Sequence, residues 1–270
     1  MALKIVFGGQ SSHINFVRHD RLFLGEGLFE TIKVLDGVPC YAELHWQRLH
    51  QSANFLSIPF DLSLPAWLDE LSSYIKASNL QNGGIKAVLS SGSAPRGLTA
   101  KGTTPYLFLE AFNYQCDFSP IRLIRAPWLR DSNNPIYKIK SINYLEAIMA
   151  SRYAKEQGAH DVLFFNLDNF ALETTVANLF LIIDQQIITP PLSCNILPGI
   201  TRNRILKLCK RLNKPYLETM ISTAMLANAD AVFVCNTLQS IRSVKALDKF
   251  NYNEHHPLID KLRELLTKVI

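Results

Sequence analysis

The chain has 270 residues, of which 48% are hydrophobic and 19% charged, and its formal net charge is +5 at pH 7. These values are ordinary for a globular protein, and the length allows one large domain or two smaller ones. The positive excess is modest and forms no basic run typical of nucleic-acid binding, so it favours small anionic ligands instead. No apolar run approaches the roughly 20 residues that a membrane span needs.

The cysteines are scattered, odd in number and include no C-x-x-C pair. This pattern argues against a disulfide framework and against a zinc site, and it fits a reducing compartment. We therefore expect a cytoplasmic protein that binds no metal, no membrane and no nucleic acid.

The first part of the chain predicts a compact α+β unit, residues 1–112. Asp36-Gly37 is a hairpin signal, because both residues tolerate positive φ. Apolar residues at helical spacing predict a helix from Glu43, and Ser63 is a candidate cap for a second helix. The predicted strands are residues 28–35, 38–41, 85–90 and 106–111.

The second part, residues 121–270, follows a polar linker at 113–120 that contains a proline. Here predicted strands and helices alternate with tight hairpins, which indicates mixed sheets rather than a doubly wound parallel sheet. No G-x-G-x-x-G follows a strand and no Walker-type loop is present, so dinucleotide and ATP binding lose support. The predicted strands are residues 121–127, 161–166, 179–183, 187–189 and 230–235.

Two residues of this half could grip one cofactor. Lys140 precedes a predicted helix, and Glu173 lies beyond the strand that follows it. If they converge, the lysine could form a Schiff base with an aromatic aldehyde, and the carboxylate could keep a ring nitrogen protonated. Taken alone, each is more simply explained as a solvated surface residue.

A phosphate site is predicted where Pro198-Gly199 turns the chain into a helix. The first amides of that helix, at Ile200 and Thr201, lack intrahelical partners and carry the positive end of the helix dipole. Thr201 could equally be a simple helix cap. Arg48 could be a second clamp, since guanidinium matches phosphate bidentately, or a solvated arginine. Thr237 could add a hydroxyl, or sit in an ordinary turn.

Five motifs, in this order along nearly the whole chain, resemble those of the class IV, fold-type IV pyridoxal-phosphate enzymes. That family includes branched-chain and D-amino-acid aminotransferases and aminodeoxychorismate lyase. The motifs are Gly25–Thr31, His45–Leu49, Lys140–Leu145, Glu173–Phe180 and Leu197–Arg202.

The resemblance implies a fold, a cofactor and an assembly. The fold is a two-domain α/β protein with mixed sheets, like D-amino-acid aminotransferase, with pyridoxal 5'-phosphate in the interdomain cleft, and members are generally homodimers. Lys140 resembles the Schiff-base lysine and Glu173 the carboxylate at the pyridine nitrogen. The residues that resemble the phosphate shell are Arg48, Ile200, Thr201 and Thr237.

Three features resemble aminodeoxychorismate lyase more than the aminotransferases: the short chain, the loop ending Pro95-Arg96-Gly97, and the segment Val234–Leu238. They imply conversion of 4-amino-4-deoxychorismate to 4-aminobenzoate and pyruvate in folate biosynthesis, with Arg96 and Glu30 on the substrate side. Ser91 and Ser243 depart from the lyase pattern, which keeps an amino-acid aminotransferase as the alternative.

Overall fold

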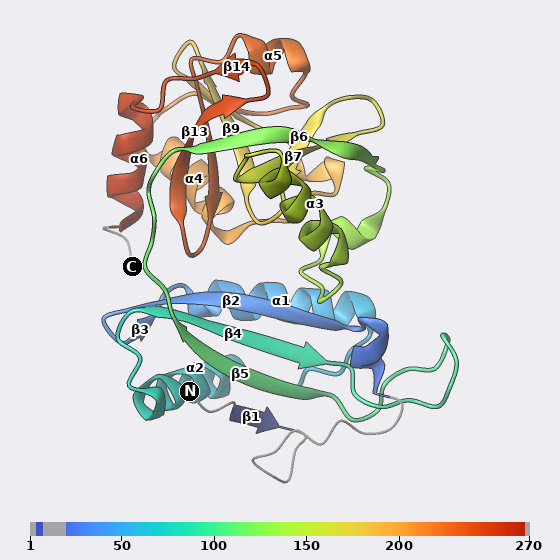
Figure 1. Ribbon diagram of the computed structural model, residues 1–270. Coiled ribbons are helices and arrows are strands. Elements are labelled where there is room, and N and C mark those ends of the chain that lie inside the picture. The colour runs from blue at the N-terminus through green and yellow to red at the C-terminus, as the bar shows by residue number, and fades with distance from the viewer. Residues whose placement is uncertain (1–3, 8–19, 268–270) are drawn as a thin grey trace. The chain divides into compact units, whose positions relative to one another are not determined.

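The computed structural model describes residues 4–7 and 20–267, and the chain separates into two compact units (Figure 1). The first unit comprises residues up to 115 together with Ile139–Asn143. The second comprises Cys116–Lys138 and the chain from Tyr144 onward. Each unit combines helices with its own sheet, which confirms the predicted mixed α/β class.

The first unit is a five-stranded antiparallel sheet in the order β1-β5-β4-β2-β3. The helices α1 and α2 pack on it through one apolar cluster, which includes Leu49 of α1 and Trp67 and Leu71 of α2. The elements are β1 Lys4–Phe7, η1 Arg21–Leu24, β2 Gly27–Leu35, β3 Val38–Pro39, α1 Ala42–Leu56, α2 Leu64–Ser78, β4 Gly83–Ser90 and β5 Tyr106–Asn113.

In this unit the predicted helix cap is confirmed, and one predicted strand is shorter than expected. Ser63 Oγ accepts a hydrogen bond from Ala66 N at 3.4 Å, so the predicted cap of α2 is confirmed. The return strand is shorter than predicted and ends at Pro39, because the chain turns at Tyr41, with a positive φ of 55°, and enters α1 at Ala42.

One segment from later in the chain belongs to the first unit. The backbone of Ile139–Asn143 lies against β2, where Phe29 N donates to Lys140 O at 2.9 Å and Ile142 N donates to Gly27 O at 3.1 Å. Ile139 also packs on the apolar cluster. The segment is thereby held as an extra strand-like edge, and Lys140 is placed in this unit.

The second unit contains a nine-stranded mixed sheet. A further pairing of β8 with β9 closes part of that sheet into a barrel. The strands are β6 Ile121–Arg130, β7 Asp161–Asn166, β8 Ala171–Thr174, β9 Asn178–Ile183, β10 Gln186–Thr189, β11 Tyr216–Glu218, β12 Ala231–Asn236, β13 Ser240–Leu247 and β14 Phe250–Asn251. The helices are η2 Pro135–Lys138, α3 Leu145–Glu156, η3 Leu192–Cys194, α4 Ile200–Arg211, α5 Thr223–Ala227 and α6 Pro257–Thr267.

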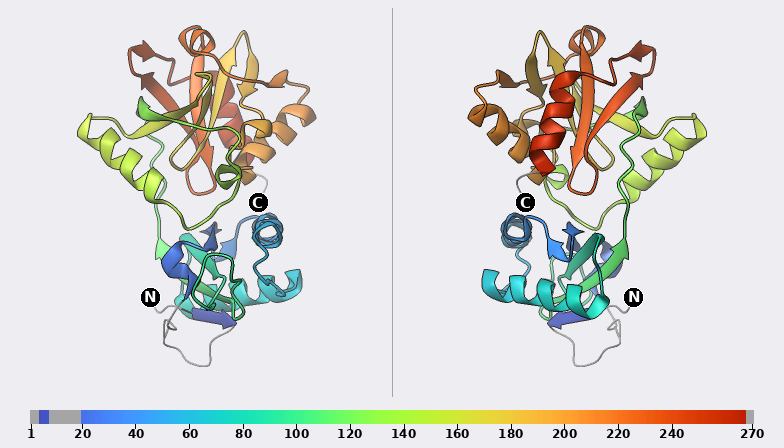
Figure 2. Two further views of the ribbon diagram at one scale, coloured as in Figure 1. Left: turned by 90° about the vertical axis from the view of Figure 1, so that its right-hand side faces the viewer. Right: turned by 90° about the vertical axis from the view of Figure 1, so that its left-hand side faces the viewer.

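The apolar run of β7 is explained by two cores. Leu163 and Phe165 belong to the cluster shared by the strands, whereas Val162 and Phe164 pack in a cluster with Ala150 and Ala154 of α3. A strand covered on both faces loses the alternation of polar and apolar residues. Helices α4 and α6 share a further apolar cluster with β12. Figure 2 shows the ribbons of both helices beside the sheet of this unit.

Three details differ from the predicted elements of the second unit. β6 continues past Pro127 to Arg130, because its register with β7 shifts between Arg125 and Leu129, where a proline without an N–H is tolerated. Glu173 lies beyond β7 as predicted, within a separate short strand, β8, that was not predicted. Further elements that were not predicted are β11, β13, β14 and α5. Among the helices within residues 20–267, none has the length and apolar character needed to cross a membrane.

Candidate functional site

Lys140 is presented by the first unit beside an aromatic side chain. Its backbone carbonyl is bound by Phe29 N, and its Nζ lies 4.3 Å from the centroid of the Phe29 ring. The side chain is half-buried. Lys140 is thus a lysine with a fixed backbone and a defined direction, unlike the solvated surface lysine that is the default for this residue type.

Arg48 of α1 is held by a buried carboxylate on β2. Its Nε donates to Glu30 Oε1 at 2.8 Å and its Nη2 to Glu30 Oε2 at 2.6 Å, a bidentate arrangement. His45, one turn earlier on α1, places Nδ1 2.6 Å from Glu30 Oε2. Arg48 is therefore a positioned guanidinium rather than a solvated one.

The charges of this triad follow from burial and pairing. Burial alone would raise the pKa of the Glu30 carboxyl, but Arg48 and then His45 lower it to about 2. Burial also lowers the pKa of His45, although Glu30 opposes that change. At neutral pH a neutral His45 donates its Nδ1–H to an ionised Glu30. The contacts of Glu30 favour a role in orienting Arg48, and its predicted part in substrate binding stays a prediction.

Arg96 is exposed in the loop between β4 and β5, and the base of that loop is tied down. The Arg21 guanidinium donates to Gly97 O at 2.8 Å and is ion-paired with Glu26. Gly92 has a φ of +80°, and a Cβ there would meet Thr104 O at 2.0 Å, so the turn requires glycine. Arg96 is thus an exposed cation on a loop that Arg21 anchors. The sequence carried no signal for this role of Arg21.

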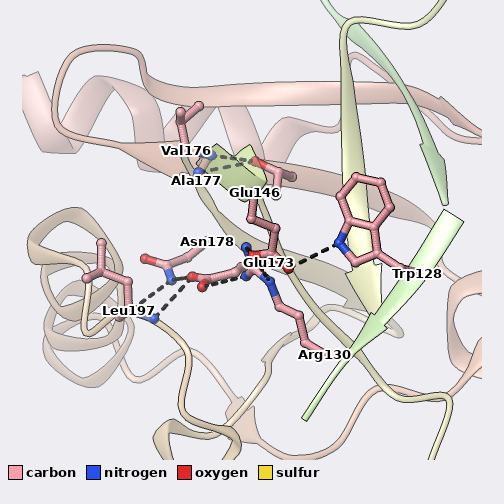
Figure 3. A network of polar contacts seen from close by, with 9 residues as sticks. Trp128, Arg130, Glu146, Glu173, Val176, Ala177, Asn178 and Leu197 are labelled. Carbon is pink, nitrogen blue, oxygen red and sulfur yellow. Dashed lines mark hydrogen bonds and ion pairs between the residues drawn. The ribbon is translucent and has the colours of Figure 1, made fainter. Parts of the chain in front are cut away.

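Glu173 is buried in the second unit and surrounded by hydrogen-bond donors (Figure 3). Its Oε2 accepts from Asn178 Nδ2 at 3.2 Å and from Leu197 N at 3.2 Å, and its Oε1 lies 3.4 Å from Arg130 Nη1. Donors of this kind favour the ionised form of a carboxylate. Glu173 can therefore present a fixed negative charge.

Arg130 connects Glu173 to a second carboxylate. Its Nε and Nη2 contact Glu146 Oε2 at 2.9 and 2.8 Å. The other Glu146 oxygen accepts from Trp128 Nε1 at 3.1 Å. The guanidinium also stacks on the Phe164 ring, 3.5 Å from its centroid. These contacts fix Arg130 between Glu146 and Glu173.

The N-terminus of α4 has the form of an anion cradle. Its N-cap is Gly199, with no side-chain cap, so the alternative that Thr201 caps the helix is excluded. A Cβ on Gly199 would lie 1.9 Å from Asn178 Oδ1, so a larger residue there would displace the Asn178 side chain. Asn178 Nδ2 also donates to Leu197 O at 2.9 Å. One asparagine therefore links the carboxylate of Glu173 to the start of α4.

Thr237 lies in the turn between β12 and β13, half-buried. The turn is closed by Gln239 N, which donates to Asn236 Oδ1 at 2.8 Å. Asn236 Nδ2 reaches Val176 O at 3.3 Å, next to the β8–β9 connection. Thr237 thus lies on the same unit as α4, and its contact with a phosphate stays a prediction.

The residues present fit pyridoxal phosphate. The second unit alone supplies a buried carboxylate for a ring nitrogen and an uncapped helix start for a phosphate, joined through Asn178. Lys140, which the motif resemblance implies as the Schiff-base lysine, belongs to the first unit. Sequence reasoning missed the supporting residues Arg130 and Glu146, because nothing in their spacing marks them. His45 and Asn178 each lay inside a quoted motif without a role.

Comparison with known proteins identifies the family of this chain. The family model described as Amino-transferase class IV matches residues 27–247. A sequence relative from Methanocaldococcus jannaschii, provisionally named a branched-chain-amino-acid aminotransferase, is 30% identical over 251 residues, which cover 90% of this chain and 86% of that protein.

Two solved structures named as 4-amino-4-deoxychorismate lyases are also similar. One from Legionella pneumophila, provisionally named, has 47% sequence identity and a TM-score of 0.94, and the match covers 96% of each chain. One from Pseudomonas aeruginosa has 26% identity and a TM-score of 0.83 over 98% of each chain. These similarities confirm the fold predicted from the motifs.

Proposed function

Because this chain belongs to the class IV aminotransferase family, whose members depend on pyridoxal phosphate, we propose that it is a lyase that converts 4-amino-4-deoxychorismate into 4-aminobenzoate and pyruvate. The observation that carries the proposal is the 47% identity, at a TM-score of 0.94, with the Legionella protein named for this activity. The lyase-like segments around Arg96 and Thr237 also support it.

Within this proposal, the cofactor when bound supplies an aldehyde that condenses with amines and a protonated ring that accepts electrons. Lys140 Nζ would act as the general base that takes the proton from the amine-bearing carbon of the substrate. Loss of that proton lets the enolpyruvyl C–O bond break, so the ring becomes aromatic. The departing enol takes up a proton and becomes pyruvate.

The other residues bind and orient. Glu173 holds the ring nitrogen in its protonated form, since a buried carboxylate with several donors stays ionised. Arg48 and the amides of Ile200 and Thr201 hold the phosphate, with the Thr237 hydroxyl beside them. Arg96 binds a substrate carboxylate.

The alternative is an amino-acid aminotransferase, favoured by the 30% identity with the Methanocaldococcus protein and by 28% identity with a D-alanine aminotransferase of Bacillus licheniformis. Lys140 and Glu173 serve both reactions and cannot separate them. A lyase needs no second substrate, whereas an aminotransferase needs a keto acid to complete its cycle.

The test is incubation of the holoenzyme with 4-amino-4-deoxychorismate alone, followed by assays for 4-aminobenzoate and pyruvate. Parallel reactions contain leucine or D-alanine with 2-oxoglutarate. Multiple turnovers without a keto acid are expected. Robust turnover of an amino-acid pair with no 4-aminobenzoate would refute the lyase and establish the aminotransferase.

We also propose that the protein is a cytoplasmic homodimer. Helix α3 carries three exposed apolar side chains at positions that share one helical face, Leu145, Ile148 and Met149. Exposed apolar faces of this kind are typical of subunit interfaces. Light scattering at two protein concentrations measures the mass directly, and a monomer at both would refute the dimer.

A further inference from the structure

The Arg130 guanidinium lies between two carboxylates that it contacts unequally (Figure 3). Two of its nitrogens contact Glu146 Oε2, at 2.9 and 2.8 Å, whereas its one contact with Glu173 Oε1 is longer, at 3.4 Å. The Arg130 and Glu173 side chains are about equally buried, with 8% and 10% exposed, and that of Glu146 is 29% exposed. Arg130 therefore interacts more strongly with Glu146 than with Glu173.

The three side chains together carry one net negative charge, from two carboxylates and one guanidinium. Buried charges are unfavourable unless they are paired. A protonated ring nitrogen at Glu173 would place a positive charge directly against this carboxylate. The arrangement then consists of two ion pairs, Glu146 with Arg130 and Glu173 with the cofactor.

We propose that Glu146 is a positioning residue that occupies Arg130 and so reserves the Glu173 carboxylate for the protonated ring nitrogen of the cofactor. This inference rests on the proposed role of Glu173. It assigns a function to Glu146, which lies in the first turn of α3, and it explains why a cation can stand beside Glu173 without displacing the ring proton.

Loss of the Glu146 charge would redirect Arg130. In a Glu146→Gln variant, the guanidinium keeps a single ionised partner in this network, Glu173, and the 3.4 Å contact can shorten. A cation closer to Glu173 lowers the proton affinity of the group that shares its carboxylate. The ring nitrogen should then lose its proton more readily.

The first experiment measures that proton directly. Holoenzyme is prepared with pyridoxal phosphate labelled with ¹⁵N in the ring, and the ¹⁵N chemical shift is recorded at one pH. In Glu146→Gln the signal should move toward the position of the unprotonated nitrogen. The matched control is Glu156→Gln, which removes the same charge from an exposed position of the same helix and should leave the signal unchanged.

The second experiment removes Arg130, the cation that would compete with the ring nitrogen for the Glu173 carboxylate. Arg130→Met should keep the ring nitrogen protonated, and Glu146→Gln combined with Arg130→Met should restore the wild-type signal that Glu146→Gln alone loses. If Glu146 only stabilised α3, the two substitutions would add rather than cancel. An unshifted signal in Glu146→Gln, or additive changes in the double variant, would overturn the proposal.

Cofactor affinity offers a readout that does not depend on activity. Glu146→Gln should weaken binding of pyridoxal phosphate by about tenfold, as expected when a charge-assisted hydrogen bond is weakened. Binding of an analogue with carbon in place of the ring nitrogen should not change. Equal losses for both ligands would mean a general structural effect and would contradict the proposal.

The role of Glu173 is checked separately. Glu173→Gln should itself shift the ¹⁵N signal toward the unprotonated position. If it does not, the assignment of Glu173 fails, and with it the proposed binding mode. If Glu173→Gln shifts the signal and Glu146→Gln does not, only the positioning role of Glu146 is refuted.

Discussion

Glu173 and Asn178 are partners across the pairing of β8 with β9, and Asn178 Nδ2 donates both to Glu173 Oε2 at 3.2 Å and to Leu197 O at 2.9 Å. The same asparagine fills the space beside Gly199 that a Cβ would need. One side chain thus sets the distance between a buried carboxylate and the start of α4. The site of the second unit is built around this amide.

Replacement of Asn178 tests that arrangement. In Asn178→Ala, Glu173 and the start of α4 both lose a hydrogen bond, so cofactor affinity should fall by about 1–3 kcal/mol. Asn203→Ala, at an exposed position of α4, is the matched control and should have little effect. Fluorescence titration with pyridoxal phosphate measures both, and equal affinities would show that Asn178 does not organise the site.

Lys140→Ala should abolish covalent attachment of the cofactor and lower turnover by at least about 10²-fold, since the lysine also transfers protons. Lys138→Ala is the control, because Lys138 is the nearest other lysine. Borohydride reduction followed by peptide mass spectrometry locates the attachment. A label on Lys138, or on any lysine other than Lys140, would show that the central assignment is incorrect.

Two substitutions among the proposed phosphate-binding residues should weaken cofactor binding. Arg48→Ala and Thr201→Ala should each weaken cofactor binding by about 1–3 kcal/mol, the cost of a lost hydrogen bond to a charged group. Pyridoxal without phosphate should bind wild type and variants equally, which separates phosphate contacts from general damage. Unchanged affinity in both variants would place the phosphate elsewhere.

The lowered pKa of Glu30 predicts that the free energy of unfolding depends on pH. Its pKa is lowered from 4.5 to about 2, so its ion pair contributes fully above pH 4.5 and is lost as the pH falls through about 2. Glu30→Gln breaks a buried pair and should cost about 3–5 kcal/mol in unfolding free energy near pH 7. That deficit should shrink as the pH falls from 4.5 toward 2.

Urea unfolding at a series of pH values measures this deficit. Glu110→Gln, at an exposed position on β5, provides the control and should show a small difference that does not vary with pH. A deficit in Glu30→Gln that stays constant down to pH 2 would mean that the Glu30 charge does not stabilise the fold.

Arg96→Ala should raise the KM for 4-amino-4-deoxychorismate with less effect on kcat, because removal of a binding contact made equally in substrate and transition state affects KM alone. The control is Lys101→Ala, which removes a second exposed cation of the same loop. Equal kinetics for Arg96→Ala and wild type would show that the loop does not hold the substrate.

The sequence by itself was enough for local structure and for the family. The Asp36-Gly37 turn, the Ser63 cap and the apolar periodicity of α1 and α2 depend on neighbouring residues, so they can be read without the fold. The motifs around Lys140, Glu173 and Gly199 identified the cofactor, because the chemistry restricts residue types at those places.

Only the tertiary structure decided which side chains meet. Arg130 and Glu146 are 16 residues apart, and Glu30 and Arg48 are 18 apart. The two residues of each pair lie on different elements, so no local period predicts the contact. Ile139–Asn143 returns to β2 through backbone hydrogen bonds, which any sequence can make. Local signals specify elements, but contacts between distant residues depend on the packing of whole sheets and helices, and that packing gives Glu173 and Arg48 their partners.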